Sequence, residues 1–123
     1  MNIKGKTALV TGANRGLGTA FAQALLDAGA AKVYAGARDP RLVKDPRMTP
    51  IRLDVTSPAN VATAAATCGD VDILINNAGA MHAKTVMAED SVEILKREMD
   101  VNVLGVLAMC KALPRCLRTM VEG

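Results

Sequence analysis

A glycine-rich segment near the N-terminus has the residue types and spacing of a phosphate-binding turn. Residues 11–18 read Thr-Gly-Ala-Asn-Arg-Gly-Leu-Gly and follow directly on the apolar run 8–10. Gly12 permits a tight turn, Gly16 lets backbone amides approach a phosphate, and Gly18 lets a helix pack closely on the sheet. A plain turn needs only one glycine. The segment therefore predicts a strand, a turn and a helix N-terminus that together hold the pyrophosphate of a dinucleotide.

Two arginines near this turn predict which dinucleotide is bound. Arg15 lies inside the turn, and Arg38 follows the predicted strand 32–37. Binding of NAD calls for a carboxylate at this strand end, to accept hydrogen bonds from the ribose hydroxyls. Two guanidinium groups instead suit a 2′-phosphate in charge and geometry, so we predict NADP in preference to NAD. Two alternatives stay open: a shift of the strand end by one residue would bring in Asp39, or both arginines are solvated surface charges.

Further polar residues follow the predicted strands or lie in a predicted helix. Asp54 comes after the third strand, residues 76–79 read Asn-Asn-Ala-Gly after the fourth, and Asn102 lies in a later helix. Each alone has an ordinary explanation: Asp54 could end a strand in an Asx turn, Asn76 could tie the sheet with its amide, and Asn102 could be a polar helix position. Their order along the chain, behind the glycine-rich turn, favours a functional set.

Strands and helices that would position these residues alternate along the chain. Apolar runs predict strands at 7–10, 32–37, 51–53 and 71–75, and helical spacing predicts helices at 17–28, 59–67, 88–99 and 100–119. Gly29 and Gly69 stand where helices should end, Ser57 is a predicted N-cap, and Pro114 should kink the last helix. Residues 40–50 hold three prolines and predict a loop with one helical turn. The alternation indicates an α/β fold, a Rossmann-type doubly wound parallel sheet of about four strands in one domain, 1–123.

Together, the ordered motifs resemble those of the short-chain dehydrogenase/reductase family over essentially the whole chain. The resemblance implies a Rossmann-type domain that binds NAD(P). It implies that Asp54 hydrogen-bonds the adenine end, with Val55 packed beside it, and that residues 77–79 lie along the nicotinamide ribose. Asn102 would hold a water in the proton relay, as the catalytic residue present. The predicted cofactor-binding residues are Gly12, Asn14, Arg15, Gly16, Leu17, Gly18, Arg38, Asp54, Val55, Asn77, Ala78 and Gly79.

The other catalytic residues implied by this resemblance are absent from the sequence. The family uses a serine that polarises the carbonyl and a Tyr-x-x-x-Lys pair, in which tyrosine is the general acid, and these follow the asparagine helix. Tyr34 is the only tyrosine and has Arg38 four residues later, and Ser91 precedes Asn102. We therefore expect the cofactor-binding half of an NADP(H)-dependent oxidoreductase for carbonyls or alcohols, inactive alone. The alternative is a non-catalytic nucleotide-binding or subunit-pairing module.

Composition argues against several other classes of protein. The net charge of +3 is spread along the chain, without the basic runs and interleaved aromatics of a nucleic-acid-binding surface. The longest apolar run, 103–110, is too short to span a bilayer. Three cysteines, at 68, 110 and 116, have no metal-binding or redox spacing, and His82 is interpreted as an exposed loop residue. We expect a cytoplasmic protein that binds neither nucleic acid, membrane nor metal.

The fourth strand is expected to be a weak point of the fold. In the sheet order of the resembled family this strand is interior, whereas here residues 73–75 would form an exposed edge. The last helix would also lose its neighbours. We therefore expect self-association through this strand and the last helix.

Overall fold

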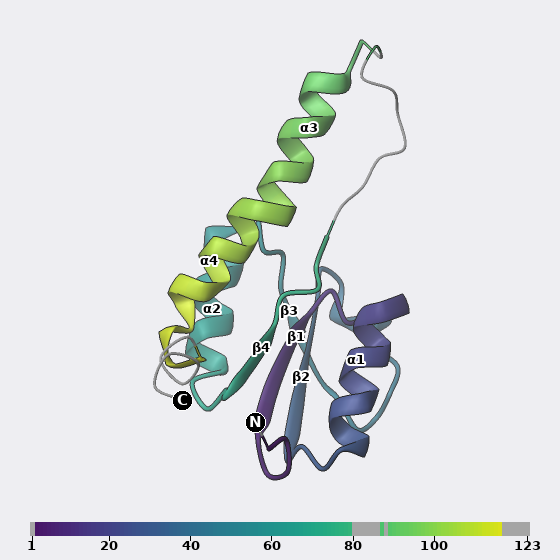
Figure 1. Ribbon diagram of the computed structural model, residues 1–123, viewed down its shortest axis with the longest axis vertical. Helices are drawn as coiled ribbons and strands as arrows, with labels where there is room; N and C mark the ends of the chain where they lie inside the picture. The colour runs from purple at the N-terminus through teal and green to yellow at the C-terminus, as the bar shows by residue number, and fades with distance from the viewer. Residues whose placement is uncertain (1, 80–86, 88, 117–123) are drawn as a thin grey trace.

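Residues 2–79, 87 and 89–116 are described by a computed structural model, in which a four-stranded parallel sheet has helices on both faces (Figure 1). The strands are β1 (Thr7–Thr11), β2 (Lys32–Ala37), β3 (Thr49–Arg52) and β4 (Ile73–Ile75), in the order β3-β2-β1-β4. The helices are α1 (Gly16–Asp27), α2 (Pro58–Thr67), α3 (Ser91–Met99) and α4 (Gly105–Ala112). A 3₁₀ turn covers Pro40–Leu42, and Asp100–Leu104 is π-helical. The predicted Rossmann-type α/β sheet is confirmed.

Alternate residues of the strands supply one core on each face of the sheet. Leu9 packs on the face covered by α2 and α4, and its neighbour Val10 packs on the face covered by α1. Both side chains are fully buried. The continuous apolar run at 8–10 therefore reflects an interior parallel strand that is covered from both sides.

Because every strand pair is parallel, the carboxyl ends of the strands meet at one edge of the sheet. Thr11 of β1 pairs with Gly36 of β2, and the preceding Val10 pairs with Ile75 of β4. The segments that follow these strands are consequently neighbours, although they lie far apart in the sequence. In open α/β sheets this edge is where ligands bind.

Local signals in the sequence end the helices as predicted. Gly29, at φ +98°, ends α1 with its N–H donating to the Leu26 carbonyl and the N–H of Ala30 donating to the Leu25 carbonyl. This pair of hydrogen bonds is a Schellman motif, which requires the left-handed conformation of glycine. At α2, the Ser57 side chain accepts from the backbone N–H at position 60 (3.2 Å), which confirms the predicted N-cap.

Several segments differ from the sequence prediction: β4 covers Ile73–Ile75 of the predicted 71–75, and Asp100–Leu104, at the start of the predicted last helix, is π-helical. Pro50, predicted in a loop, lies inside β3; β3 is an edge strand, where a missing N–H is tolerated. Pro114 is predicted to kink one continuous helix, and the structure breaks the helix there: α4 stops at Ala112, Leu113 leaves the helical conformation, and residues 114–116 are helical again. Residues 88 and 117–119 of the predicted helices lie outside the described residues.

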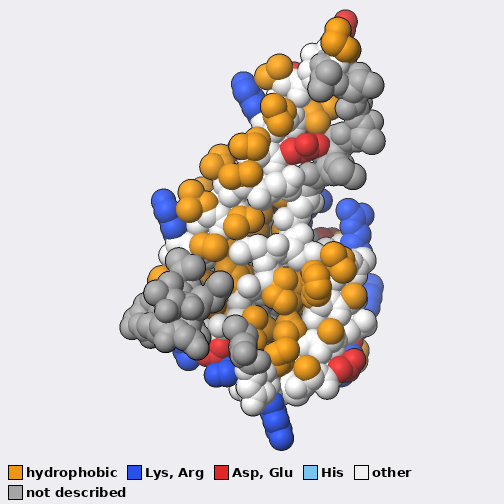
Figure 2. All heavy atoms as spheres, viewed as in Figure 1, with side chains coloured by type: hydrophobic (Ala, Val, Ile, Leu, Met, Phe, Trp, Pro, Cys, Tyr) orange, Lys and Arg blue, Asp and Glu red, His pale blue; other side chains and the backbone are white. Residues whose placement is uncertain are grey.

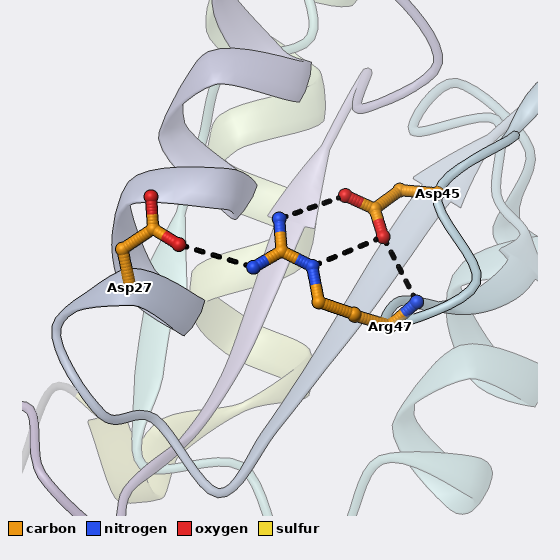
Figure 3. A network of polar contacts seen from close by, with 3 residues as sticks. All are labelled: Asp27, Asp45 and Arg47. Atoms are coloured by element: carbon orange, nitrogen blue, oxygen red, sulfur yellow. Dashed lines mark hydrogen bonds and ion pairs between the residues drawn. The ribbon is translucent and has the colours of Figure 1, made fainter.

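Arg47 links the loop between β2 and β3 to α1 through hydrogen bonds (Figure 3). Its guanidinium group donates to both oxygens of Asp45 (3.2 and 3.0 Å) and to Asp27 at the end of α1 (3.0 Å). Hydrogen bonds to the two carboxylates raise the pKa of Arg47, and the same contact lowers the pKa of Asp45. Arg47 and Asp27 are exposed and Asp45 is half-buried, so the main effect of these contacts is to fix the path of the loop into β3.

Candidate functional site

A pocket of about 640 Å³ lies at the carboxyl edge of the sheet. The glycine-rich turn, the segments after β2, β3 and β4, and the junction of α3 with the π-helical segment form its walls. Its lining consists of Gly12, Asn14, Arg15, Gly16, Leu17, Gly18, Arg38, Leu53, Asp54, Val55, Thr56, Asn77, Ala78, Gly79, Arg97, Asp100 and Val101. Every residue predicted to contact the cofactor is in this set. The volume is within the range of small-molecule sites.

The N-terminus of α1 opens into this pocket. Gly12 (φ +64°) and Gly16 (φ +55°) adopt the left-handed conformation that directs the chain through the turn. Arg15, the N-cap residue, makes no side-chain cap hydrogen bond, and the first turn of α1 has no acidic residue. The first N–H groups of α1 and the positive end of its dipole are thus available to an anion.

Thr11 and Asn77 join the glycine-rich turn to the segment after β4. The Thr11 hydroxyl, which is buried, accepts hydrogen bonds from the backbone N–H groups of Asn77 (3.0 Å) and Ala78 (2.9 Å). The Asn77 side chain donates to the Gly12 carbonyl (3.1 Å). These contacts fix residues 77–79 against the turn. Sequence reasoning gave Thr11 no such role, and the only signal was a threonine at the end of a buried strand.

Asn76 and Asn102 also belong to the predicted motifs, and both lie at or close to the segment after β4. The tie to the glycine-rich turn is made by Asn77 and not by Asn76, whose amide lies 3.9 Å from the Cys110 sulfur. Asn102 lies in the π-helical segment and is not part of the pocket lining. Its Oδ1 would be 3.4 Å from a Cβ added at Gly79, so Asn102 lies directly behind the Asn-Ala-Gly segment.

Asp54 lines the pocket as an ionised hydrogen-bond acceptor. Its carboxylate accepts from the Thr56 hydroxyl (2.6 Å) and from the Thr56 backbone N–H (2.9 Å), which is the Asx turn considered from the sequence. These hydrogen bonds lower the pKa of Asp54, and the positive charge of Arg38 contributes in the same direction. The carboxylate therefore stays charged at neutral pH while it faces the pocket.

Arg38, and not Asp39, reaches the pocket from the end of β2. The strand ends at Ala37, and Arg38 follows directly and lines the pocket. The Asp39 carboxylate is engaged by the Arg41 backbone N–H (3.1 Å) and by the Arg41 guanidinium group (3.0 Å to each oxygen). Asp39 caps the 3₁₀ turn with this contact and is not part of the pocket lining.

The only tyrosine is a packing residue, as the sequence indicated. Tyr34 is 5% exposed in the core on the α2 and α4 face. Its hydroxyl donates to Asp70 (3.0 Å) and accepts from Lys32 (3.2 Å), near the amino end of β2. The pocket lies at the other end of the strand. His82 lies outside the described residues, and the described residues contain no cluster of His, Cys, Asp and Glu suited to a metal ion.

A parallel sheet whose strand ends surround a glycine-rich helix N-terminus defines a Rossmann-type nucleotide-binding protein. The family model described as short chain dehydrogenase matches residues 6–123. The chain therefore belongs to the short-chain dehydrogenase/reductase family. None of the helices in the described residues has the length and apolar character needed to cross a membrane.

The chain is similar to short-chain dehydrogenases, including solved structures that contain a nicotinamide dinucleotide. A short-chain dehydrogenase/reductase of Pestalotiopsis microspora is 38% identical, over 93% of this chain and 44% of its own length. A short chain dehydrogenase from Burkholderia cenocepacia, solved in complex with NADP, has a TM-score of 0.89 and 42% identity over 97% of this chain and 51% of its own. A 3-ketoacyl-(acyl-carrier-protein) reductase from Brucella melitensis, complexed with NADH, has a TM-score of 0.77 and 33% identity, over 89% of this chain and 49% of its own. The chain thus spans about half the length of these proteins.

Proposed function

We propose that this chain forms the cofactor-binding part of an NADP(H)-dependent oxidoreductase that acts on a carbonyl or an alcohol. The main support for the proposal is that the side chains which line the pocket near the end of β2 are positively charged, where an NAD-binding protein would have a carboxylate. Arg15 and Arg38 line the pocket, whereas the nearby Asp39 is bound to Arg41. A guanidinium pair in place of a ribose-binding carboxylate favours a 2′-phosphate.

The remaining pocket residues have proposed roles along the dinucleotide. The N-terminus of α1 binds the pyrophosphate through backbone N–H groups of residues 16–18. Asp54 accepts a hydrogen bond from the adenine end, and Val55 packs beside the ring. Asn77, Ala78 and Gly79 lie along the nicotinamide ribose, in the position that Thr11 fixes. The nicotinamide, when bound, supplies the hydride for reduction of a carbonyl.

Asn102 is the one residue with a proposed catalytic role, as the holder of a water in the proton relay. The 123 residues contain no Tyr-x-x-x-Lys pair, because Tyr34 is the only tyrosine. We propose that these residues alone bind the cofactor without catalysing hydride transfer, and that the general acid comes from other residues. The three cysteines are free thiols, which fits a reducing compartment, and we propose a cytoplasmic location.

Titration of the protein with NADPH and NADH tests the proposal. We expect saturable binding of both nucleotides, tighter for NADPH, followed by nucleotide fluorescence. We also expect a higher melting temperature with NADPH, since a ligand at 100 times its Kd stabilises the folded state by about 2.7 kcal/mol. Failure of both nucleotides to bind would refute the assignment as a cofactor-binding domain. Equal affinity for the two would refute the preference for NADP.

A second candidate function, subunit pairing, is favoured by exposed apolar surface. Large apolar side chains along α3, the π-helical segment and α4 are between 45 and 59% exposed: Val92, Leu95, Met99, Val103, Leu104 and Leu107. Figure 2 shows apolar side chains running along this helix. β4 is an edge of the described sheet, as predicted. We propose that the chain self-associates through the outer edge of β4 and this helical face.

Leu107→Glu is expected to weaken self-association, because it places a charge on the apolar face. Sedimentation velocity over a range of concentrations measures the effect. Leu42→Glu is a matched control, since Leu42 and Leu107 are both 49% exposed and Leu42 lies in the 3₁₀ turn, away from this face. A wild-type chain that sediments as a monomer at every concentration would contradict the proposal.

A further inference from the structure

Arg97 lines the proposed cofactor pocket from α3, a wall that lies apart from the glycine-rich turn and the end of β2. Arg15 and Arg38 belong to the glycine-rich turn and to the end of β2, whereas Arg97 belongs to α3. It enters the lining together with Asp100 and Val101 of the same helical segment. The pocket thus has guanidinium groups on two separate walls.

These pocket arginines differ from the other described arginines in their partners. Outside the pocket, each described arginine donates to a protein oxygen: Arg41 to Asp39, Arg47 to Asp27 and Asp45, Arg52 to the Arg38 carbonyl, and Arg115 to Asp72. In the same described part of the chain, the guanidinium groups of Arg15, Arg38 and Arg97 make no hydrogen bond or ion pair. Their donors therefore remain available to a ligand.

The packing of the long helix determines where Arg97 lies. Gly105, at the start of α4, lies against Val55: a Cβ added at Gly105 would be 2.5 Å from the Val55 Cγ2. Val101 lies about one turn before Gly105 and lines the pocket, and Arg97 lies about one further turn before Val101 on the same side. The helical wall near Val55 therefore consists of an apolar side chain followed by a guanidinium group.

We propose that Arg97 is a cofactor-positioning residue whose guanidinium group packs against the adenine ring of the bound dinucleotide. The inference rests on the proposed function, in which Asp54 and Val55 hold the adenine end. A flat ring fits beside the apolar Val55 and Val101, and a planar, delocalised cation stacks favourably on an aromatic face. Arg15 and Arg38, on the other wall, bind the 2′-phosphate in this proposal. Arg97 instead contacts the adenine ring, which NADPH and NADH have in common.

Arg97→Met tests this role, because methionine keeps an aliphatic side chain and removes the cation. We expect NADPH and NADH to bind more weakly by the same factor, roughly three- to thirty-fold. Lys96→Met is the matched control: Lys96 is an exposed neighbour on α3 that does not line the pocket, and its loss changes the net charge equally. Lys96→Met should leave both affinities unchanged. Both variants should melt at the wild-type temperature without nucleotide, which a structural role for Arg97 would not allow.

The possible outcomes separate this inference from the proposed function. A loss confined to NADPH would assign Arg97 to the 2′-phosphate and overturn the adenine contact. If the wild-type protein binds both nucleotides and Arg97→Met binds them with the same affinities, the inference is overturned and the proposed function stands. A wild-type protein that binds neither nucleotide would refute the proposed function and this inference with it.

Discussion

Gly18→Ala is expected to weaken NADPH binding on the order of 100-fold and to lower the free energy of unfolding by about 1–3 kcal/mol. A Cβ at position 18 would overlap the carbonyl oxygen of Gly12 and would be 2.5 Å from the Asn77 Nδ2. The Asn77 side chain donates to that same carbonyl, so the methyl group would break the contact that joins the two turns. NADPH titration and denaturant unfolding measure the two effects.

Alanine substitutions at two other glycines distinguish the effect of steric overlap from the effect of backbone strain. Gly69 has open space around it and no positive φ, so Gly69→Ala should change neither binding nor stability appreciably. Gly16 also has open space but a φ of +55°, so Gly16→Ala should cost only about 1–2 kcal/mol of backbone strain. If Gly18→Ala bound NADPH as tightly as Gly69→Ala, close packing of α1 on the turn would not be needed for the site.

Arg38→Ala is expected to weaken NADPH binding roughly 10- to 150-fold and to leave NADH binding nearly unchanged. The proposed contact with the 2′-phosphate is a charge-assisted hydrogen bond, worth about 1.5–3 kcal/mol, and NADH has no such phosphate. Parallel titrations with the two nucleotides give the ratio of affinities directly. The nearby Arg15 should show the same selectivity, because it lines the same pocket.

Lys44→Ala is the control for the change in net charge, since Lys44 is exposed and does not line the pocket. It should leave the ratio of NADPH to NADH affinity at the wild-type value. If Arg38→Ala lost affinity for NADPH and NADH equally, Arg38 would contact the part that the two nucleotides share. The main support for NADP would then be removed.

The proposed cofactor site and the proposed pairing surface occupy different parts of the molecule. The pocket lies at the carboxyl edge of the sheet, whereas the exposed apolar side chains follow the long helix (Figures 1 and 2). Only α3 and the π-helical segment take part in both, through Arg97, Asp100 and Val101 on the pocket side. Leu107→Glu should therefore change the oligomeric state without altering cofactor affinity.

The sequence by itself determined the fold and the glycine-rich turn, because both are encoded locally. Apolar runs separated by helical periodicity specify the alternation of strands and helices. Gly12, Gly16 and Gly29 adopt a left-handed φ, which glycine tolerates because it has no Cβ. This tolerance belongs to the residue type, so the turn and the end of α1 could be predicted without tertiary contacts. The carboxyl ends of parallel strands must share an edge, which is why the predicted cofactor residues line one pocket.

The tertiary structure alone decided which side chains complete the pocket. Whether Arg38 or Asp39 lines the pocket depends on where β2 ends and on the contact of Asp39 with Arg41. Thr11 and Asn77 are 66 residues apart, and only the pairing of β1 with β4 brings them together. Arg97 enters the site because Gly105 lets the long helix approach Val55. Helical periodicity fixes which residues share a face, but contacts between distant elements fix where that face points.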